Sequence, residues 1–220
     1  MKLLPPPLPA IILDPIVRLA LSEDLGRAGD LTTDATIAPE TQLSVVIAAR
    51  QPGVIAGLDA AAHALTLIDP SVELDVRMDD GTAVKPGDVV ARLDGSARSI
   101  LTAERTMLNF IGRLSAVATM TRNYVAKISH TSATIVCTRK TTPGHRALEK
   151  RAVRCGGGTA HRYGLDDAIL IKDNHIAACG GSVALALERA KAYAGHLRMI
   201  EIEVDTLDQF AEALKHGPHA

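Results

Sequence analysis

The sequence has no tryptophan, and only 2% of its 220 residues are aromatic. Proteins that bind single-stranded nucleic acid stack the bases on aromatic side chains, so this composition argues against that function. The formal net charge of -1 at pH 7 also gives no overall attraction to nucleic acid or to an anionic membrane. Any site for an anion must therefore come from a local concentration of arginine and lysine.

Paired cysteines and long apolar runs are also missing. Cys137, Cys155 and Cys179 are far apart and form no CxxC pair, and an odd count of this kind is typical of reduced thiols in the cytoplasm. No apolar run approaches the roughly 18 residues needed to cross a bilayer. The Pro-rich start, residues 1–10, lacks the basic-then-apolar layout of a signal peptide. We expect a soluble cytoplasmic protein with no membrane partner.

The first 94 residues predict helices around a small β layer. Asp14 followed by proline has the form of a helix N-cap and first helical position, and Gly26 would end that helix. The further elements expected are a turn at 30–33, a strand at 41–49, a helix at 58–68 and a β layer at 72–94. Segment 72–94 also resembles biotinyl and lipoyl carrier domains, but it has no evident modifiable lysine at a hairpin tip.

A long helix is predicted from Arg98 to Tyr124 by apolar residues at helical spacing. A second face of this helix is polar and comprises Arg98, Thr102, Arg105, Asn109 and Arg113. A solvated face is the plain interpretation of such a stripe. No acidic residue lies three or four positions from Arg105 on it, so we expect this charge to serve a partner off the helix.

Beyond residue 130 the pattern alternates between strand and helix. Strands are expected at 134–137, 167–171 and 199–204, and helices at 146–155, 182–194 and 207–215. This alternation predicts an α/β fold with a parallel sheet or barrel, in which ligands bind beyond the carboxyl ends of the strands. An eightfold barrel takes roughly 250 residues, so we expect the barrel to be truncated.

Basic side chains are concentrated between residues 138 and 172. They are Arg139, Lys140, Arg146, Lys150, Arg151, Arg154, Arg162 and Lys172, against the three acids Glu149, Asp166 and Asp167. This surplus suits a ligand with several fixed negative charges, because arginine makes planar two-point contacts to carboxylate or phosphate. Arg139, Lys140 and Lys172 follow apolar strands, which favours a functional role. Lys150, Arg151 and Arg154 are expected to coat the surface of a helix.

The same window contains two weaker signals. The triple glycine at 156–158 is a poor phosphate-loop motif without a GxxxxGK[ST] sequence, and we favour a flexible turn. His161 and His175 with Asp173 match no zinc-binding spacing.

Seven short motifs in this sequence resemble, in order and spacing, those of the quinolinate phosphoribosyltransferase family. They are EDLG from Glu23, GDLT from Gly29, ERTMLNF from Glu104, TRKTTPG from Thr138, RALEK from Arg146, GGGTAHR from Gly156 and IKDNH from Ile171. The resemblance runs from about residue 14 to the last expected helix. It implies an N-terminal α/β sandwich followed by an incomplete α/β barrel of the type II phosphoribosyltransferase kind. We place these domains at 1–114, including the long linking helix, and at 115–220.

The resemblance also implies a reaction. The phosphoribosyl group of phosphoribosyl pyrophosphate passes to quinolinate with decarboxylation, giving nicotinate mononucleotide, pyrophosphate and CO₂ in NAD biosynthesis. It further implies Mg²⁺ and a homodimer in which Arg105 crosses to the partner's site. The substrate-binding positions would be Arg105, Thr138, Arg139, Lys140, His161, Arg162, Lys172 and Glu201. Lys140, Lys172 and Glu201 would be catalytic, with Glu201 holding the metal indirectly.

Some residues depart from the family pattern. Cys137, His145 and Ala160 replace residues that are usual in the family, but they leave the charged positions in place. The acid that pairs with Glu201, and the Gly-rich phosphate loops, would lie on later strands, past residue 220. Two alternatives therefore stay open beside the transferase: an inactive or quinolinate-binding fragment, and the related protein associated with molybdate transport.

Overall fold

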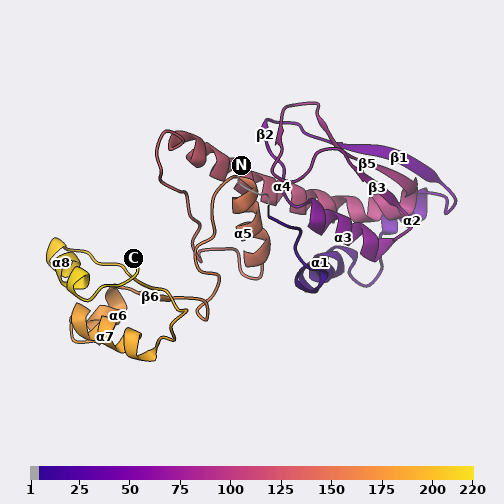
Figure 1. The fold of residues 1–220 in the computed structure, drawn as a ribbon. Helices are drawn as coiled ribbons and strands as arrows, with labels where there is room; N and C mark the ends of the chain where they lie inside the picture. Colours follow the sequence, from indigo (N-terminus) through magenta and orange to yellow (C-terminus); the bar gives the residue numbers. More distant parts are fainter. Residues whose placement is uncertain (1–4) are drawn as a thin grey trace. The chain divides into compact units, whose positions relative to one another are not determined.

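The structure is a computed structural model that describes residues 5–220, and the chain forms two compact units, residues 1–161 and 162–220 (Figure 1). The helices of the first unit are α1 (Ala10–Leu25), α2 (Leu31–Thr36), α3 (Leu58–Ile68), α4 (Ala97–Lys127) and α5 (Arg146–Cys155). Its strands are β1 (Gln42–Ala48), β2 (Gly53–Val54), β3 (Glu73–Val76), β4 (Ala83–Val84) and β5 (Val89–Ser96). Within residues 5–220 no helix combines the length and the apolar character needed to cross a membrane.

The β layer of the first unit is an antiparallel sheet in the order β1-β5-β3, with β2 and β4 paired separately. Residues of β1 alternate between half-buried and exposed, as expected for a strand with one face on the core. Val45 of β1 lies opposite Leu93 of β5 in the register. The predicted β layer is therefore confirmed, and it extends to β1.

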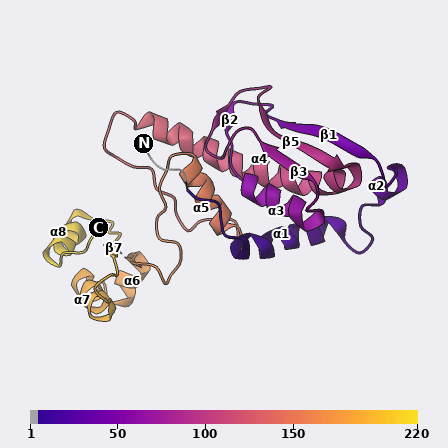
Figure 2. The ribbon, with the colours of Figure 1, turned by 45° about the vertical axis from the view of Figure 1, so that its right-hand side comes forward.

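Helix α4 runs the length of the first unit beside the sheet, with α3, α1 and α5 packed along it (Figures 1 and 2). Its buried side chains recur at helical spacing and include Ile100, Met107, Phe110, Ile111 and Leu114. These residues join α1, α3 and the strands in one apolar core. The long helix predicted from the sequence is confirmed, and it is the element on which the others of this unit pack.

The glycines at 156–158 form a close contact between α5 and α4. A Cβ atom on Gly156 would lie 2.6 Å from Thr121 Cβ and would also collide with the Ala118 carbonyl. On Gly158 it would lie 2.8 Å from Val153 Cγ1, and Gly157 has φ +93°, where a side chain is strained. Residues 156 and 157 thus form the expected turn, and the close contacts of its glycines make it a packing feature as well.

Replacing Gly156 with alanine is expected to lower the free energy of unfolding by about 1–3 kcal/mol, because the new methyl overlaps backbone atoms that cannot move aside. Gly112→Ala on α4 is the matched control. Its Cβ meets nothing within 4 Å, and alanine favours a helix over glycine by about 1 kcal/mol. Urea denaturation of both variants measures the difference; a neutral Gly156→Ala would contradict the packing.

Several boundaries in the first unit differ from the predictions. Helix α1 begins at Ala10 and carries Pro15 inside it, so Asp14 is not its N-cap. Instead the Asp14 carboxylate accepts hydrogen bonds from Arg18 Nε at 2.7 Å and the His63 ring at 3.1 Å. The expected turn after Asp30 is the short helix α2, with the Asp30 side chain as its cap. An aspartate can cap a helix or accept hydrogen bonds from other side chains, so the sequence could not show which of these roles Asp14 has.

The expected strand at 134–137 is also wrong. Val136 makes only an isolated parallel bridge with Thr159, supported by bonds from Cys137 N to the Thr159 carbonyl (3.1 Å) and from Thr159 N to the Ile135 carbonyl (2.9 Å). An apolar run of four residues suits either a strand or a bridged loop, because only long-range pairing distinguishes them. The bridge still places residues 137 and 159 side by side.

The second unit confirms the strand–helix alternation with a parallel pair. It contains β6 (Ile169–Ile171), α6 (Asp173–Ala178), α7 (Val183–Tyr193), β7 (Ile200–Ile202) and α8 (Leu207–Lys215). Strands β6 and β7 are parallel, and Leu170 lies opposite Glu201 in the register. A separate apolar core includes Ile171, Leu187 and Ile200. Helix α6 was not predicted from the sequence. The chain is an α/β protein.

Candidate functional site

The segment that follows Cys137 forms a compact turn in the first unit. Lys140 N donates to Thr138 Oγ1 at 3.0 Å, and Thr141 N donates to the Arg139 carbonyl at 3.0 Å. Thr138 and Lys140 are exposed, whereas Arg139 is half-buried. These local bonds fix the backbone from which three of the predicted site residues project.

Two arginine side chains each hide a donor without an acceptor. The Nε atoms of Arg139, in the first unit, and of Arg162, in the second, are buried and have no hydrogen-bond partner among residues 5–220. Arg162 Nη1 donates to the Ala168 carbonyl at 3.1 Å. A buried cationic donor without an acceptor is costly and needs an explanation. An anionic ligand supplies one, because carboxylates and phosphates accept strong charge-assisted hydrogen bonds from guanidinium groups.

Helix α5 carries three consecutive buried charges, which corrects the surface role expected for two of them. Glu149, Lys150 and Arg151 are 7%, 4% and 9% exposed, whereas Arg154 lies on the surface as expected. Their flanking residues Ala147, Leu148 and Ala152 are buried too. Small apolar neighbours on both sides were the signal of burial in the sequence.

The carboxylate of Glu149 joins α5 to α4 and to the turn that follows Cys137. It accepts hydrogen bonds from Arg113 Nη2 at 2.8 Å, from Thr142 Oγ1 at 2.8 Å and from Thr142 N at 3.3 Å. Burial raises the pKa of Glu149, but the bonds from Arg113 and Thr142 outweigh burial and hold the pKa below its ordinary value of 4.5. The folded state therefore favours the charged carboxylate.

Glu149→Gln is expected to reduce the acid sensitivity of the fold. A carboxyl with a depressed folded-state pKa stabilises the protein above its unfolded pKa, and this stabilisation disappears as pH falls through the folded value. The variant should be less stable than the parent at neutral pH, with the gap closing below pH 4.5. Urea denaturation across this range measures it. Glu73→Gln, at an exposed position on β3, is the control, and a constant gap for Glu149→Gln would contradict the expectation.

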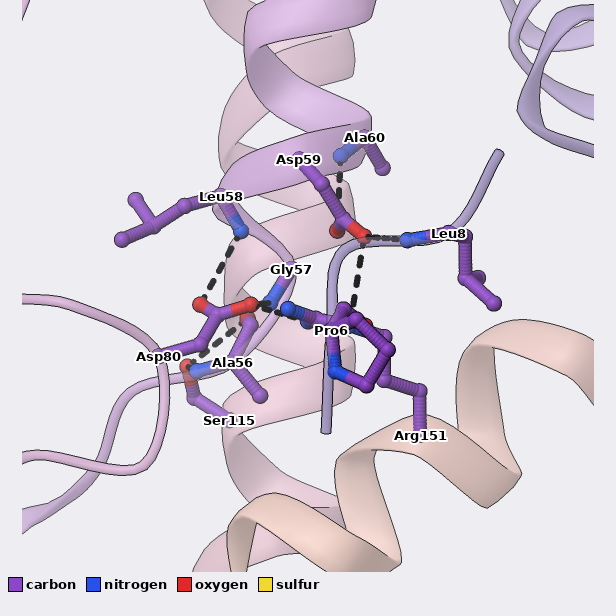
Figure 3. A network of polar contacts seen from close by, with 10 residues as sticks. All are labelled: Pro6, Leu8, Ala56, Gly57, Leu58, Asp59, Ala60, Asp80, Ser115 and Arg151. Atoms are coloured by element: carbon purple, nitrogen blue, oxygen red, sulfur yellow. Dashed lines mark hydrogen bonds and ion pairs between the residues drawn. The ribbon is translucent and has the colours of Figure 1, made fainter. Parts of the chain in front are cut away.

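Arg151 ties α5 to the start of α3 through a buried ion network (Figure 3). Its guanidinium is paired with Asp80 and lies 3.4 Å from the Asp59 carboxylate, and Nε donates to the Pro6 carbonyl at 3.0 Å. Asp80 also accepts from Gly57 N and Leu58 N, each at 3.2 Å. Burial lowers the pKa of Arg151, but Asp80 and Asp59 outweigh burial and raise it. The network fixes α5 within the first unit.

The polar stripe of α4 divides into paired and unpaired residues. Arg98 Nε donates to the Ile37 carbonyl at 2.8 Å, Thr102 Oγ1 donates to Asp30 at 3.2 Å, and Arg113 binds Glu149. Arg105 is exposed and has no hydrogen bond or ion pair with any residue in the described part of the chain. It lines a groove of about 450 Å³ between β1 and α4. A plain solvated stripe is thus wrong for most of this face.

In the second unit the predicted residues lie at the carboxyl ends of β6 and β7. Lys172 follows β6, and its Nζ is 2.5 Å from Glu203 Oε2 on the residue after β7. The backbone N of Lys172 donates to His175 Nδ1 at 2.9 Å, which caps α6. Glu201 is half-buried on β7 itself. The sequence correctly placed Lys172 directly after one strand and Glu201 on the next.

His161 closes the first unit, and its carbonyl accepts a hydrogen bond from Lys150 Nζ at 3.1 Å. The described residues bring no three His, Cys, Asp or Glu side chains together as a metal cluster. Mg²⁺ is usually held by one or two carboxylates together with substrate phosphates. A single carboxylate such as that of Glu201 is therefore enough for this role.

Both halves of the chain match one known family. Residues 30–115 match the description "Quinolinate phosphoribosyl transferase, N-terminal domain", and residues 117–220 match the corresponding C-terminal domain. The chain is 44% identical over 207 residues to the carboxylating nicotinate-nucleotide pyrophosphorylase of Mycobacterium leprae, covering 92% of this chain and 71% of the relative. The chain belongs to the quinolinate phosphoribosyltransferase family.

Solved structures agree with this assignment. The chain superposes on NadC from Streptococcus pyogenes with a TM-score of 0.93 at 41% identity, covering 97% of this chain and 75% of that one. The nicotinate-nucleotide pyrophosphorylase from Francisella tularensis gives 0.89 at 38% identity, with 95% and 73% covered. The family resemblance inferred from the motifs is therefore confirmed.

The chain spans about two thirds of the length of its curated relatives. It covers 66% of a probable carboxylating nicotinate-nucleotide pyrophosphorylase of Bacillus subtilis, at 45% identity over 195 residues and 89% of this chain. The N-terminal family match includes residues 72–94, so the carrier-domain alternative has no support. The division of the chain into domains 1–114 and 115–220 stays a prediction.

Proposed function

We propose that this protein transfers the phosphoribosyl group of phosphoribosyl pyrophosphate to quinolinate and decarboxylates the product. Nicotinate mononucleotide, pyrophosphate and CO₂ would result, as a step of NAD biosynthesis. The observation that carries the proposal is the buried, unpartnered Nε atom of Arg139, which lies in the segment with the family's TRKTTPG motif. Quinolinate bears two adjacent carboxylates, and each can accept from a guanidinium. The relatives described above favour this activity over the molybdate-associated alternative.

The proposal assigns a role to each predicted residue. By the family resemblance, Arg139 and Arg162 would bind the carboxylates, and Thr138, His161 and Lys172 would be further quinolinate-binding residues. Lys140 lies between quinolinate and phosphoribosyl pyrophosphate, where a compact cation stabilises the negative charge of the departing pyrophosphate. Once the ring nitrogen carries the ribose, the positively charged ring accepts the electrons left by the departing CO₂, so no covalent enzyme intermediate is needed.

Mg²⁺ and the ribose hydroxyls would be handled by Glu201, with the substrate's own phosphates as the other metal ligands. The metal supplies a Lewis acid for the pyrophosphate. Glu201 stands half-buried on a strand, which limits its movement. Removing the metal with EDTA should abolish turnover while leaving quinolinate binding in place.

Arg105 supports a homodimer as part of the same proposal. An exposed arginine without a partner in residues 5–220, in a groove between β1 and α4, suits a second copy that brings an anion to it. Arg105 would then complete the neighbouring quinolinate site. The unpaired Cys137, Cys155 and Cys179 suit the cytoplasm, which is the proposed location.

The activity is tested by following quinolinate, phosphoribosyl pyrophosphate and Mg²⁺ with the purified chain. The expected result is one nicotinate mononucleotide and one CO₂ for each quinolinate consumed. Quinolinate binding without turnover would replace the transferase with the binding-only alternative. Absence of both binding and turnover would overturn the proposal.

A further inference from the structure

The segment that carries Thr138, Arg139 and Lys140 is held at both ends by neighbouring side chains of α5. At its beginning, Lys150 Nζ lies 3.0 Å from Cys137 Sγ and donates to the His161 carbonyl at 3.1 Å. At its end, Thr142 gives two hydrogen bonds to the Glu149 carboxylate, from Oγ1 at 2.8 Å and from N at 3.3 Å. Segment 137–142 thus spans two anchors on one helix.

Burying the charges of these two anchors, Glu149 and Lys150, costs free energy that a purely structural role would not require. Both residues are buried, and burying a charge is unfavourable unless it is paired and hydrogen-bonded. Apolar residues of similar volume often stabilise a fold as well as a buried ionic pair does. Stability alone therefore does not account for charges at positions 149 and 150.

The geometry of α5 explains why charged residues occupy positions 149 and 150. Consecutive side chains of a helix point about 100° apart, so neighbours reach different parts of the surrounding chain. Glu149 reaches Thr142 and Arg113, while Lys150 reaches Cys137 and His161. The next residue, Arg151, is fixed by Asp80 and Asp59, so the helix that carries both anchors is itself held.

We propose that Glu149 and Lys150 are positioning residues that hold the Arg139 guanidinium ready for an anionic ligand. For quinolinate as that ligand, the inference rests on the proposed function. A segment fixed before binding loses less conformational freedom on binding, and affinity increases accordingly. Losing either anchor frees the 137–142 segment without touching the ligand.

The order of the segment is measured by hydrogen exchange, which needs no ligand. Lys150→Met removes the first anchor. Thr142→Val removes the hydrogen bond from the Thr142 hydroxyl to Glu149, the second anchor, and position 142 is exposed. The amides of Lys140 and Thr141 should exchange about tenfold faster in both variants, while those of α3 change less than about twofold. Arg154→Met, which removes an exposed charge from the same helix, and Thr142→Ser, which keeps the hydroxyl, should exchange like the parent.

Quinolinate affinity is the second readout, measured by calorimetry on the folded variants. The Kd should rise about tenfold for Lys150→Met and Thr142→Val and stay within about twofold for Arg154→Met and Thr142→Ser. A merely structural role would lower the midpoint of unfolding without changing the Kd of the folded fraction. Thr142→Val carries the test if Lys150→Met does not fold.

The two proposals fail in different ways. If the parent protein binds no quinolinate, the proposed function fails, and the exchange experiment still decides on positioning. Faster exchange confined to segment 137–142 supports the positioning role. Unchanged exchange there, or equally faster exchange across the whole first unit, overturns it.

Discussion

Replacing Arg139 with methionine is expected to raise the Kd for quinolinate by about 10- to 100-fold, because one charge-assisted hydrogen-bonding group contributes about 1.5–3 kcal/mol. Its Nε is buried and unpartnered, so the side chain has no structural bond at this atom to lose. The change therefore affects binding more than folding. Calorimetric titration of the parent and the variant with quinolinate measures the effect.

Arg139→Lys is the informative companion variant. It keeps the positive charge but loses the planar pair of donors that a carboxylate binds at two points. Its Kd should fall between those of the parent and of Arg139→Met. A lysine variant as tight as the parent would show that only charge matters at this position, and would contradict the two-point contact.

Arg151→Met is expected to lower the free energy of unfolding by about 3–5 kcal/mol, the usual cost of leaving buried charges without their partner. Asp80 and Asp59 would both lose their guanidinium, and Pro6 would lose a donor to its carbonyl (Figure 3). The loss is large relative to the stability of a typical domain. Urea denaturation of the purified variant measures it.

Two further variants distinguish the effect of the buried Arg151 network from the general effect of removing a charge. Arg77→Met removes one partner of the exposed ion pair with Asp75, which should cost less than about 1 kcal/mol. Adding Asp80→Asn to Arg151→Met should cost less than the sum of the two single changes, because the partners are coupled. Additive losses would mean that Arg151 and Asp80 contribute independently.

The sequence predicted the order of elements well where the pattern is local. The long helix α4, the β layer and the strand–helix alternation after residue 130 all follow from apolar periodicity within a few turns. The start of α1 was missed because Asp14 was a good cap, while the structure uses it to bind Arg18 and His63. Local signals cannot choose between such competing partners.

The candidate site divides in the same way. A concentration of basic residues at 138–172 could be counted in the sequence, and so could the strand ends that carry Lys172 and Glu201. The partners of Arg151 could not be identified in the sequence, since Asp59 and Asp80 lie far away in the chain. Nor could the sequence show that a buried nitrogen of Arg139 has no acceptor.

The most direct test of the account compares quinolinate with nicotinate, which lacks the second carboxylate, in calorimetric titrations of the purified protein. We expect one quinolinate per chain and an affinity at least about tenfold lower for nicotinate, since one charge-assisted contact is lost. Equal affinities for the two acids, or no saturable binding of quinolinate, would contradict it.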